Sequence, residues 1–303
     1  MSASAVRPLP LPGAIRAARS PALLGAVRAE VLKISRQRLT WAMLGVAFVF
    51  FAVVALGLSG VPATGVKRSA HTFFHDQLDI WSTIFQVGSG IFLLIAVARL
   101  MGMEFSAGTV RVLLGRGQSR LQLYAAKLIA VVALGVLLLA GFSILAGGFV
   151  ALRTIGAAGS LQPLQGLPGS DWRDLAISLA VMLVSILATT LVGLAAAILG
   201  RSLAFALGFA LAFFPADNAA TLILTLLQTL THRGFFGQVT AYLLGPNLNA
   251  MRVALLPAHQ GRAAFAVPAV PVDGLHTLVV TAAWVAILLV VPLAMLVRRD
   301  VLE

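Results

Sequence analysis

The sequence predicts an all-α integral membrane protein with six transmembrane helices. Of its 303 residues, 60% are hydrophobic and 11% are charged, whereas a soluble domain carries roughly 25% charged residues. The apolar residues come in uninterrupted runs of about 20, the length of helix that crosses ~30 Å of hydrocarbon. The formal net charge is +12, and in a membrane protein such an excess holds loops on the cytoplasmic side.

Two segments precede the first apolar run. Residues 1–20, rich in proline and arginine, are expected to form a disordered cytoplasmic tail, and residues 21–303 a single transmembrane domain. Between 23 and 40, apolar residues recur at helical spacing opposite Arg28, Lys33 and Arg36, which predicts an amphipathic elbow helix in the head-group plane. The alternative is a purely positive-inside stop before the first span.

Five spans follow from uninterrupted apolar runs. The first, 41–59, rises ~28 Å at 1.5 Å per residue. Asp79 is placed to cap the second, and Ser119 with Gln122 forms a capping box that opens the third. The remaining four ranges are 80–100, 126–152, 174–199 and 275–297.

The fifth span in order is less regular, because Pro215, Asp217 and Asn218 interrupt the apolar stretch from 202 to 231. Two alternatives are open. In the first, a short span occupies 202–218, its helix ends at about Ala216, and an interfacial or re-entrant helix follows. In the second, one long helix kinks at Pro215. The first alternative is favoured, since a carboxylate in mid-membrane is expensive. A non-spanning external helical segment is then expected around Gly245 and Pro246, before the last span.

The basic residues predict the orientation. With the N-terminus inside, fifteen of the twenty-two Lys and Arg fall in cytoplasmic segments and seven in external ones. This asymmetry favours six spans with both termini in the cytoplasm, whereas five or seven would place one basic end outside. It also explains the positive charge without nucleic acid, which is not expected as a partner.

The long cytoplasmic segment between the second and third spans is the best candidate for a partner surface. Its middle, Glu104 to Leu114, reads as a helix that offers apolar and basic side chains to a cytoplasmic subunit.

This segment resembles ABC-2-type transporter permeases. The resemblance is carried by Glu104, Gly108, Thr109, Arg111, Leu113 and Leu114, followed by Ser119, Arg120 and Lys127. Glu30, Lys33, Arg36 and Trp41 are similar to that family's elbow helix, Arg201 with Ser202 to its turn between spans four and five, and 242–251 to its external segment before span six.

The resemblance implies the permease subunit of an ATP-driven exporter in the plasma (inner) membrane. Glu104 to Leu114 would then be a coupling helix that contacts a separate ATP-hydrolysing subunit. A second permease, identical or homologous, would complete the substrate path, and lipid would surround it. The chain contains no G-x-x-x-x-G-K-[ST] run. It is therefore expected to be non-catalytic and to bind no cofactor, with ATP and Mg on the partner.

Two rival functions remain open. An ATPase-independent secondary transporter or channel would need intramembrane charge, for which Asp217 is the candidate, although a helix cap explains it as well. A membrane-embedded transferase would use His71, His75, Asp76 and Asp79. The two histidines lie four residues apart, but HExxH is not matched, so no metal is expected there.

Overall fold

The computed structural model describes residues 23–60, 65–66, 69–256 and 265–298. The predicted tail, 1–20, lies outside the described residues. Within them, the structure is helical and contains no strand, and six helices are long and apolar enough to cross a membrane. The predicted fold class and number of spans are confirmed.

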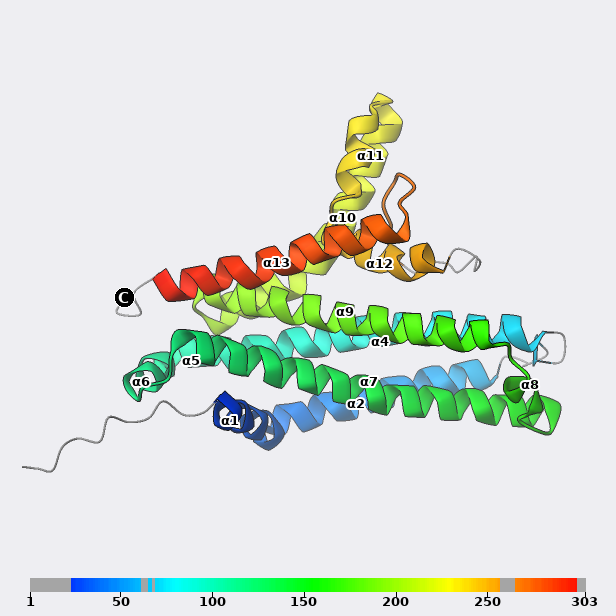
Figure 1. Cartoon of the computed structure of the whole chain (residues 1–303), viewed down its shortest axis with the longest axis horizontal. Coiled ribbons are helices and arrows are strands. Elements are labelled where there is room, and N and C mark those ends of the chain that lie inside the picture. The colour runs from blue at the N-terminus through cyan, green and yellow to red at the C-terminus, as the bar shows by residue number, and fades with distance from the viewer. Residues whose placement is uncertain (1–22, 61–64, 67–68, 257–264, 299–303) are drawn as a thin grey trace, which may run out of the picture.

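The six long helices form a bundle in which they run side by side, except that the second half of α10 projects away from it (Figure 1). They are α2 (Arg38–Ser59), α4 (Ala70–Val97), α7 (Arg120–Ala158), α9 (Gly169–Gly200), α10 (Leu203–Thr231) and α13 (Gly274–Arg298). Most extend beyond the predicted apolar ranges, because polar turns continue the helices past the hydrocarbon.

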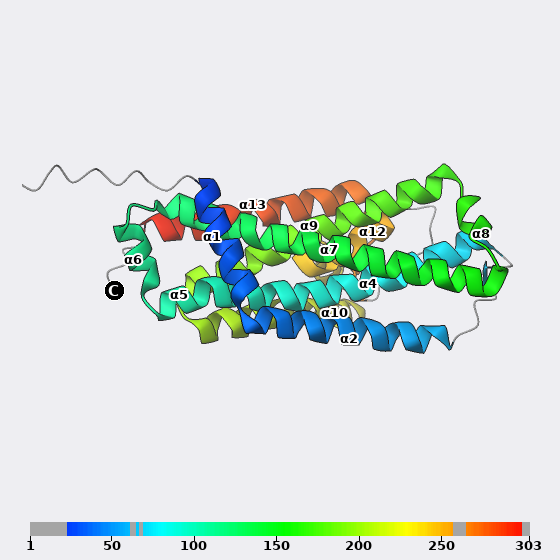
Figure 2. The ribbon, with the colours of Figure 1, turned by 90° about the horizontal axis from the view of Figure 1, so that it is seen from below.

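Short elements occupy the two ends of the bundle (Figure 1). At one end, here called the α6 end, lie α1 (Leu23–Arg36), α5 (Met103–Ser106), α6 (Thr109–Gly115) and the end of α13. At the opposite end, the α8 end, lies α8 (Gln162–Gln165). Seen from below, α1 crosses the bundle transversely at the start of α7 (Figure 2), as an amphipathic elbow would.

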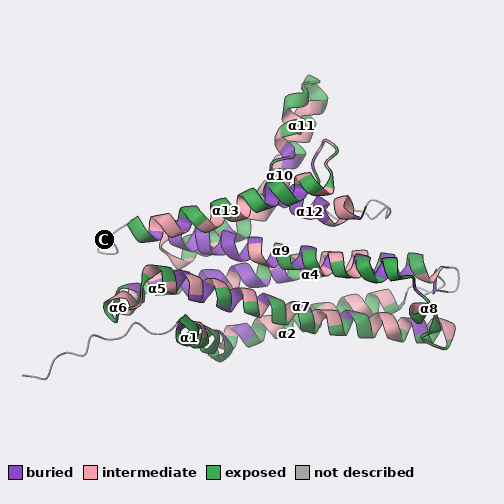
Figure 3. Cartoon of the chain, in the orientation of Figure 1, coloured by how far each residue is buried: buried purple, intermediate pink, exposed green. Residues whose placement is uncertain are grey.

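The helix α9 forms the centre of the bundle (Figure 3). Residues 188 to 198 are all buried, so α9 is apolar or small on every side there. Gly193 faces Val97 so closely that an added Cβ would lie 3.0 Å from the Val97 Cβ. Small residues thus allow close helix packing within the chain. In contrast, only Thr40 is buried in α2.

The element α10 corrects the favoured prediction for the fifth span. It is one α-helix from Leu203 to Thr231 with Pro215 inside, not a short span followed by a separate helix. Beyond the proline its second half leaves the bundle and returns through α11 (Gly234–Thr240), as Figure 1 shows. A proline inside a helix removes one backbone hydrogen bond, and beside it Asn218 Nδ2 donates to Phe214 O at 2.8 Å.

The segment before the last span is helical, as predicted. The helix α12 (Leu244–Leu255) packs against α9 and α13, and its first turns are buried. It is too short to span a bilayer.

Candidate functional site

The predicted coupling segment is two short helices rather than one. The helix α4 continues through a π-helix, η1 (Ala98–Gly102), into α5, and α6 begins after Gly108. Gly108 has φ 67°, a left-handed conformation that side chains disfavour, and this residue separates α5 from α6. The Thr109 hydroxyl donates to Glu104 O at 3.2 Å and fixes the turn between them.

The helix α6 presents most of its side chains to solvent at the tip of the α6 end. Arg111 and Val112 are exposed, Leu113 and Leu114 are half-buried, and Val110 anchors the helix with 1% exposure. A hollow of about 430 Å³, bordered by Arg111, lies between α5–α6 and the ends of α9 and α13. This end of the chain therefore offers the mixed basic and apolar surface that the sequence predicted.

Four charged side chains from three elements meet behind this surface, and we call them the charge network: Glu30, Lys33, Glu104 and Lys127. Lys33 Nζ lies 2.9 Å from Glu30 Oε1 and 2.8 Å from Glu104 Oε1. Lys127 Nζ lies 3.2 Å from Glu30 Oε2 and 2.8 Å from Glu104 Oε2. Two cations and two anions alternate, so the network has no formal net charge.

Most of the charge network is removed from water, so its ion pairs matter for stability. Lys127 is fully buried and also donates to Leu100 O at 3.2 Å, while Glu30 is 3% exposed. Burial by itself would lower the pKa of Lys33, but hydrogen bonds from Lys33 to Glu104 and Glu30 outweigh it and raise that pKa. Buried charges are tolerated only when paired in this way.

The charge network joins predicted elbow and coupling residues through a partner that the sequence did not assign. Glu30 and Lys33 belong to α1, Glu104 to α5 and Lys127 to the first turns of α7. Arg36, the third predicted elbow residue, is exposed and lies outside the network. All four members belong to the residues that carry the family resemblance, but no spacing along the sequence indicated that their side chains contact one another.

Two further interactions organise the α6 end. The capping box of Ser119 and Gln122 opens α7 as predicted. From the same turn, Arg120 donates to Leu296 O and Val297 O, both at 2.8 Å, and so caps the C-terminus of α13.

Asp217 lies in the middle of α10 and caps a different helix. Its carboxylate accepts a hydrogen bond from Gly245 N at the start of α12. An acceptor at a helix N-terminus satisfies a backbone N–H and complements the helix dipole. This geometry agrees with the capping interpretation, with the difference that the capped helix is distant in sequence.

A largely apolar cavity of about 470 Å³ lies between α4, α9, α10 and α12. Its polar lining is an amide cluster in which Asn249 Nδ2 donates to Asn218 Oδ1 at 3.0 Å and to Ala266 O at 2.9 Å. Gln86 Nε2 lies 3.4 Å from Asn249 Oδ1. An apolar cavity with a few convergent amides fits a small amphiphilic molecule.

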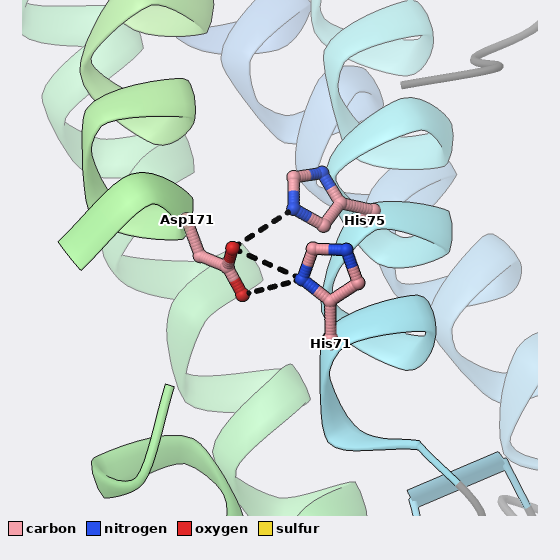
Figure 4. A group of neighbouring side chains, drawn as sticks. All are labelled: His71, His75 and Asp171. Atoms are coloured by element: carbon pink, nitrogen blue, oxygen red, sulfur yellow. Dashed lines mark hydrogen bonds and ion pairs between the residues drawn. The ribbon is translucent and has the colours of Figure 1, made fainter. Parts of the chain in front are cut away.

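The residues of the transferase hypothesis do not meet as one site. Asp76 is exposed, and Asp79 Oδ1 forms an ion pair with Arg252 Nη1 at 2.6 Å. His71 and His75 instead face Asp171 of α9 (Figure 4), a residue that the sequence reasoning missed. The only sequence signal was a carboxylate three residues before the predicted fourth span, 174–199.

The fold is that of a polytopic α-helical membrane protein. The family model described as ABC-2 family transporter protein matches residues 26–231, which is more than half of the chain. The protein belongs to this family. The matched range includes all four members of the charge network and ends with α10. The comparison with curated proteins found no match.

Proposed function

We propose that the protein is the permease subunit of an ATP-driven exporter, coupled through α5, α6 and α1 to a separate ATPase subunit. The observation that carries this proposal is the charge network. It links α5, which is joined to α6 by the Thr109–Glu104 hydrogen bond, to the elbow helix through a part-buried ion pair and to the base of α7 through a buried one. A displacement of α6 by a partner would therefore be transmitted to two further elements, because buried ion pairs resist separation.

The same proposal assigns the α6 end to the cytoplasm of a cell whose plasma membrane the chain spans. It is supported by the basic residues gathered at that end, among them Arg111, Arg116 and Arg120. Neither ATP nor Mg would bind this chain, since it has no phosphate-binding loop.

A second permease subunit would pair with this one, and lipid would cover the rest. Large apolar side chains are exposed along α2 and along the projecting half of α10, including Val46, Phe48, Leu222 and Leu226. Such surface needs either lipid or protein as its neighbour. The cavity between α4 and α10 would form part of the substrate path, which favours an amphiphilic substrate.

The coupling role can be tested by co-purification with the ATPase encoded beside this chain or co-expressed with it. Replacement of the exposed basic and the half-buried apolar residue of α6, Arg111→Asp with Leu113→Asp, should abolish recovery of the ATPase. The variant chain should still insert into the membrane, because neither side chain belongs to the buried core.

A matched control places the same two changes elsewhere. Arg233→Asp with Leu161→Asp alters one exposed arginine and one exposed leucine away from α6. This control should retain the ATPase. Equal recovery of the ATPase by both double variants and the native chain would exclude α6 as the docking element.

A further inference from the structure

We propose that His71, His75 and Asp171 form a binding site for a divalent transition-metal ion of the zinc class, which clamps α4 to α9 at the α8 end. The first turns of α4 and α9, which carry these residues, lie at the opposite end of the bundle from α1 and α5, which carry the charge network (Figure 1). The site takes no part in the proposed docking of an ATPase.

The three side chains converge from two helices. His71 and His75 lie four residues apart on one face of α4, and Asp171 lies in the first turn of α9. One ligand atom from each residue lies within 4.8 Å of the others. His71 Nδ1 is 2.9 Å from Asp171 Oδ2, and His75 Nε2 is 3.5 Å from Asp171 Oδ1 (Figure 4).

These distances fit a common metal ion. With metal–ligand bonds of ~2.0–2.1 Å, two ligands of a tetrahedral zinc ion lie about 3.3 Å apart. The separations of His71 Nδ1 and His75 Nε2 from the same oxygen, Asp171 Oδ1, are 3.0 and 3.5 Å and bracket that value. All three ligand atoms lie within 4.8 Å of one another, so binding of one ion requires side-chain rotation that brings the most distant pair closer.

The chemistry of the ligands selects the ion. Two imidazoles and one carboxylate form a mixed nitrogen and oxygen set, which suits zinc and its first-row neighbours. Magnesium and calcium prefer oxygen ligands alone. The chain contains no cysteine, so thiolate ligation does not compete.

Burial favours positive charge beside the Asp171 carboxylate. The Asp171 side chain is 1% exposed and the His75 side chain 5% exposed, and a buried carboxylate needs positive charge nearby. His71 Nδ1 lies at ordinary hydrogen-bond distances, 2.9 and 3.0 Å, from the two carboxylate oxygens, whereas His75 Nε2 is too far for such a bond. A cation between the three side chains would contact both imidazoles. Ser170 Oγ donates to Asp171 Oδ1 at 3.3 Å and would help to orient the carboxylate as an outer-shell partner.

The site is also accessible. The His71 side chain is 50% exposed, so an ion can enter from the α8 end, and water can fill a fourth coordination position. A bound ion would hold the first turns of α4 and α9 together. Relative motion of these two helices at that end would then require the ion to leave or to change its ligands.

Zinc binding to the full-length protein in detergent tests this proposal. The protein is purified with a tag that lacks histidine, stripped with a chelator and titrated with Zn²⁺ against a chromophoric competitor. The native chain should bind one ion. His71→Ala should weaken binding at least tenfold, roughly the effect of losing only an outer-shell partner. The half-exposed position of His71 makes this variant the least disruptive of the three.

Two further variants sharpen the result. Asp171→Asn keeps the shape of the side chain but removes its charge, and it should weaken binding similarly. His276→Ala is the control, because His276 Nε2 lies against Ala241 O at 2.8 Å, away from the site. This control should bind Zn²⁺ as the native chain does. Equal binding by His71→Ala and the native chain, or no binding by either, would overturn the site.

Thermal unfolding tests the clamp separately. Zn²⁺ should raise the unfolding midpoint of the native chain and of His276→Ala, because the ion binds only the folded arrangement. It should not raise that of His71→Ala, and Mg²⁺ should have no effect on any of them. Stoichiometric binding without a rise in the midpoint would overturn the clamp.

Discussion

Individual residues of the charge network show how a membrane protein keeps ionised groups in a packed interior. Lys127 is fully buried, yet two carboxylates and a backbone carbonyl surround its ammonium group. Each charge has at least one opposite neighbour, so the cost of leaving water is offset only while the set is complete.

Removal of Lys127 should be among the most destabilising single changes in the chain. Lys127→Met keeps the length of the side chain but leaves Glu30 and Glu104 with Lys33 alone, and a broken buried pair costs about 3–5 kcal/mol. Chemical unfolding in detergent measures the loss. Arg116→Met, at an exposed position, should change stability by less than ~0.5 kcal/mol.

A second change checks that charge balance is the cause. Adding Glu104→Gln to Lys127→Met restores a one-to-one set of Lys33 and Glu30. The double variant should then be more stable than Lys127→Met alone. A double variant that is less stable by the sum of both single effects would contradict the network as the reason.

Asp217 is a carboxylate inside a long apolar helix whose role follows from its hydrogen bond to Gly245 N of α12. Asp217→Ala removes the acceptor of Gly245 N and should destabilise the start of α12 by about 1 kcal/mol, the usual cost of a lost cap. Asp217→Asn retains an oxygen acceptor, so it should keep most of the stability and also the transport activity. Transport assays in vesicles decide the matter, since a complete loss with Asp217→Asn would indicate an ion-carrying carboxylate instead.

At the scale of elements, the contact between η1 and α10 fixes the position of the predicted coupling segment, α5 and α6. A Cβ added at Gly102 would lie 3.0 Å from the Leu203 Cα and 3.3 Å from the Ala206 Cβ. Ser106 Oγ also accepts a hydrogen bond from Leu203 N at 3.1 Å. The start of α10 is therefore held against η1 and α5, the two elements that precede α6.

Alanine at Gly102 should force these two elements apart. Glycine to alanine normally favours a helix by up to about 1 kcal/mol, but backbone overpacking costs ~1–3 kcal/mol. Gly102→Ala should therefore unfold at a lower temperature than Gly141→Ala, where an added Cβ meets no atom within 4 Å. Slower transport by Gly102→Ala than by Gly141→Ala would connect the contact between η1 and α10 with function. A higher unfolding temperature for Gly102→Ala than for Gly141→Ala would contradict the predicted overpacking.

At the scale of the whole molecule, the asymmetry between the two ends predicts orientation. The chain has no cysteine, so single cysteines can report which side of the membrane each end faces. Arg116→Cys at the α6 end should be protected from an impermeant maleimide in intact cells and labelled after permeabilisation. Arg173→Cys, whose native side chain is 72% exposed at the start of α9, should be labelled without permeabilisation.

The reverse labelling pattern would invert the proposed topology and remove α6 from contact with a cytoplasmic ATPase. It would leave the zinc site untouched, because that site depends on helix packing and not on the side of the membrane. The docking of an ATPase at α6 and the zinc site are therefore tested independently of each other.

Local properties of the sequence predicted five of the six spans, the amphipathic helix before the first span, the capping box and the break of pattern at Pro215. Run length, helical periodicity and capping act over a few residues, so they can be predicted without the fold. Helix packing decided the rest. Lys127 contacts Glu30 across 97 positions and His71 contacts Asp171 across 100. The helix α10 continues through Pro215, and the Asp217 carboxylate that follows is paired with Gly245 N of α12. No local pattern encodes such pairs, since they depend on which faces of distant helices the apolar core brings together.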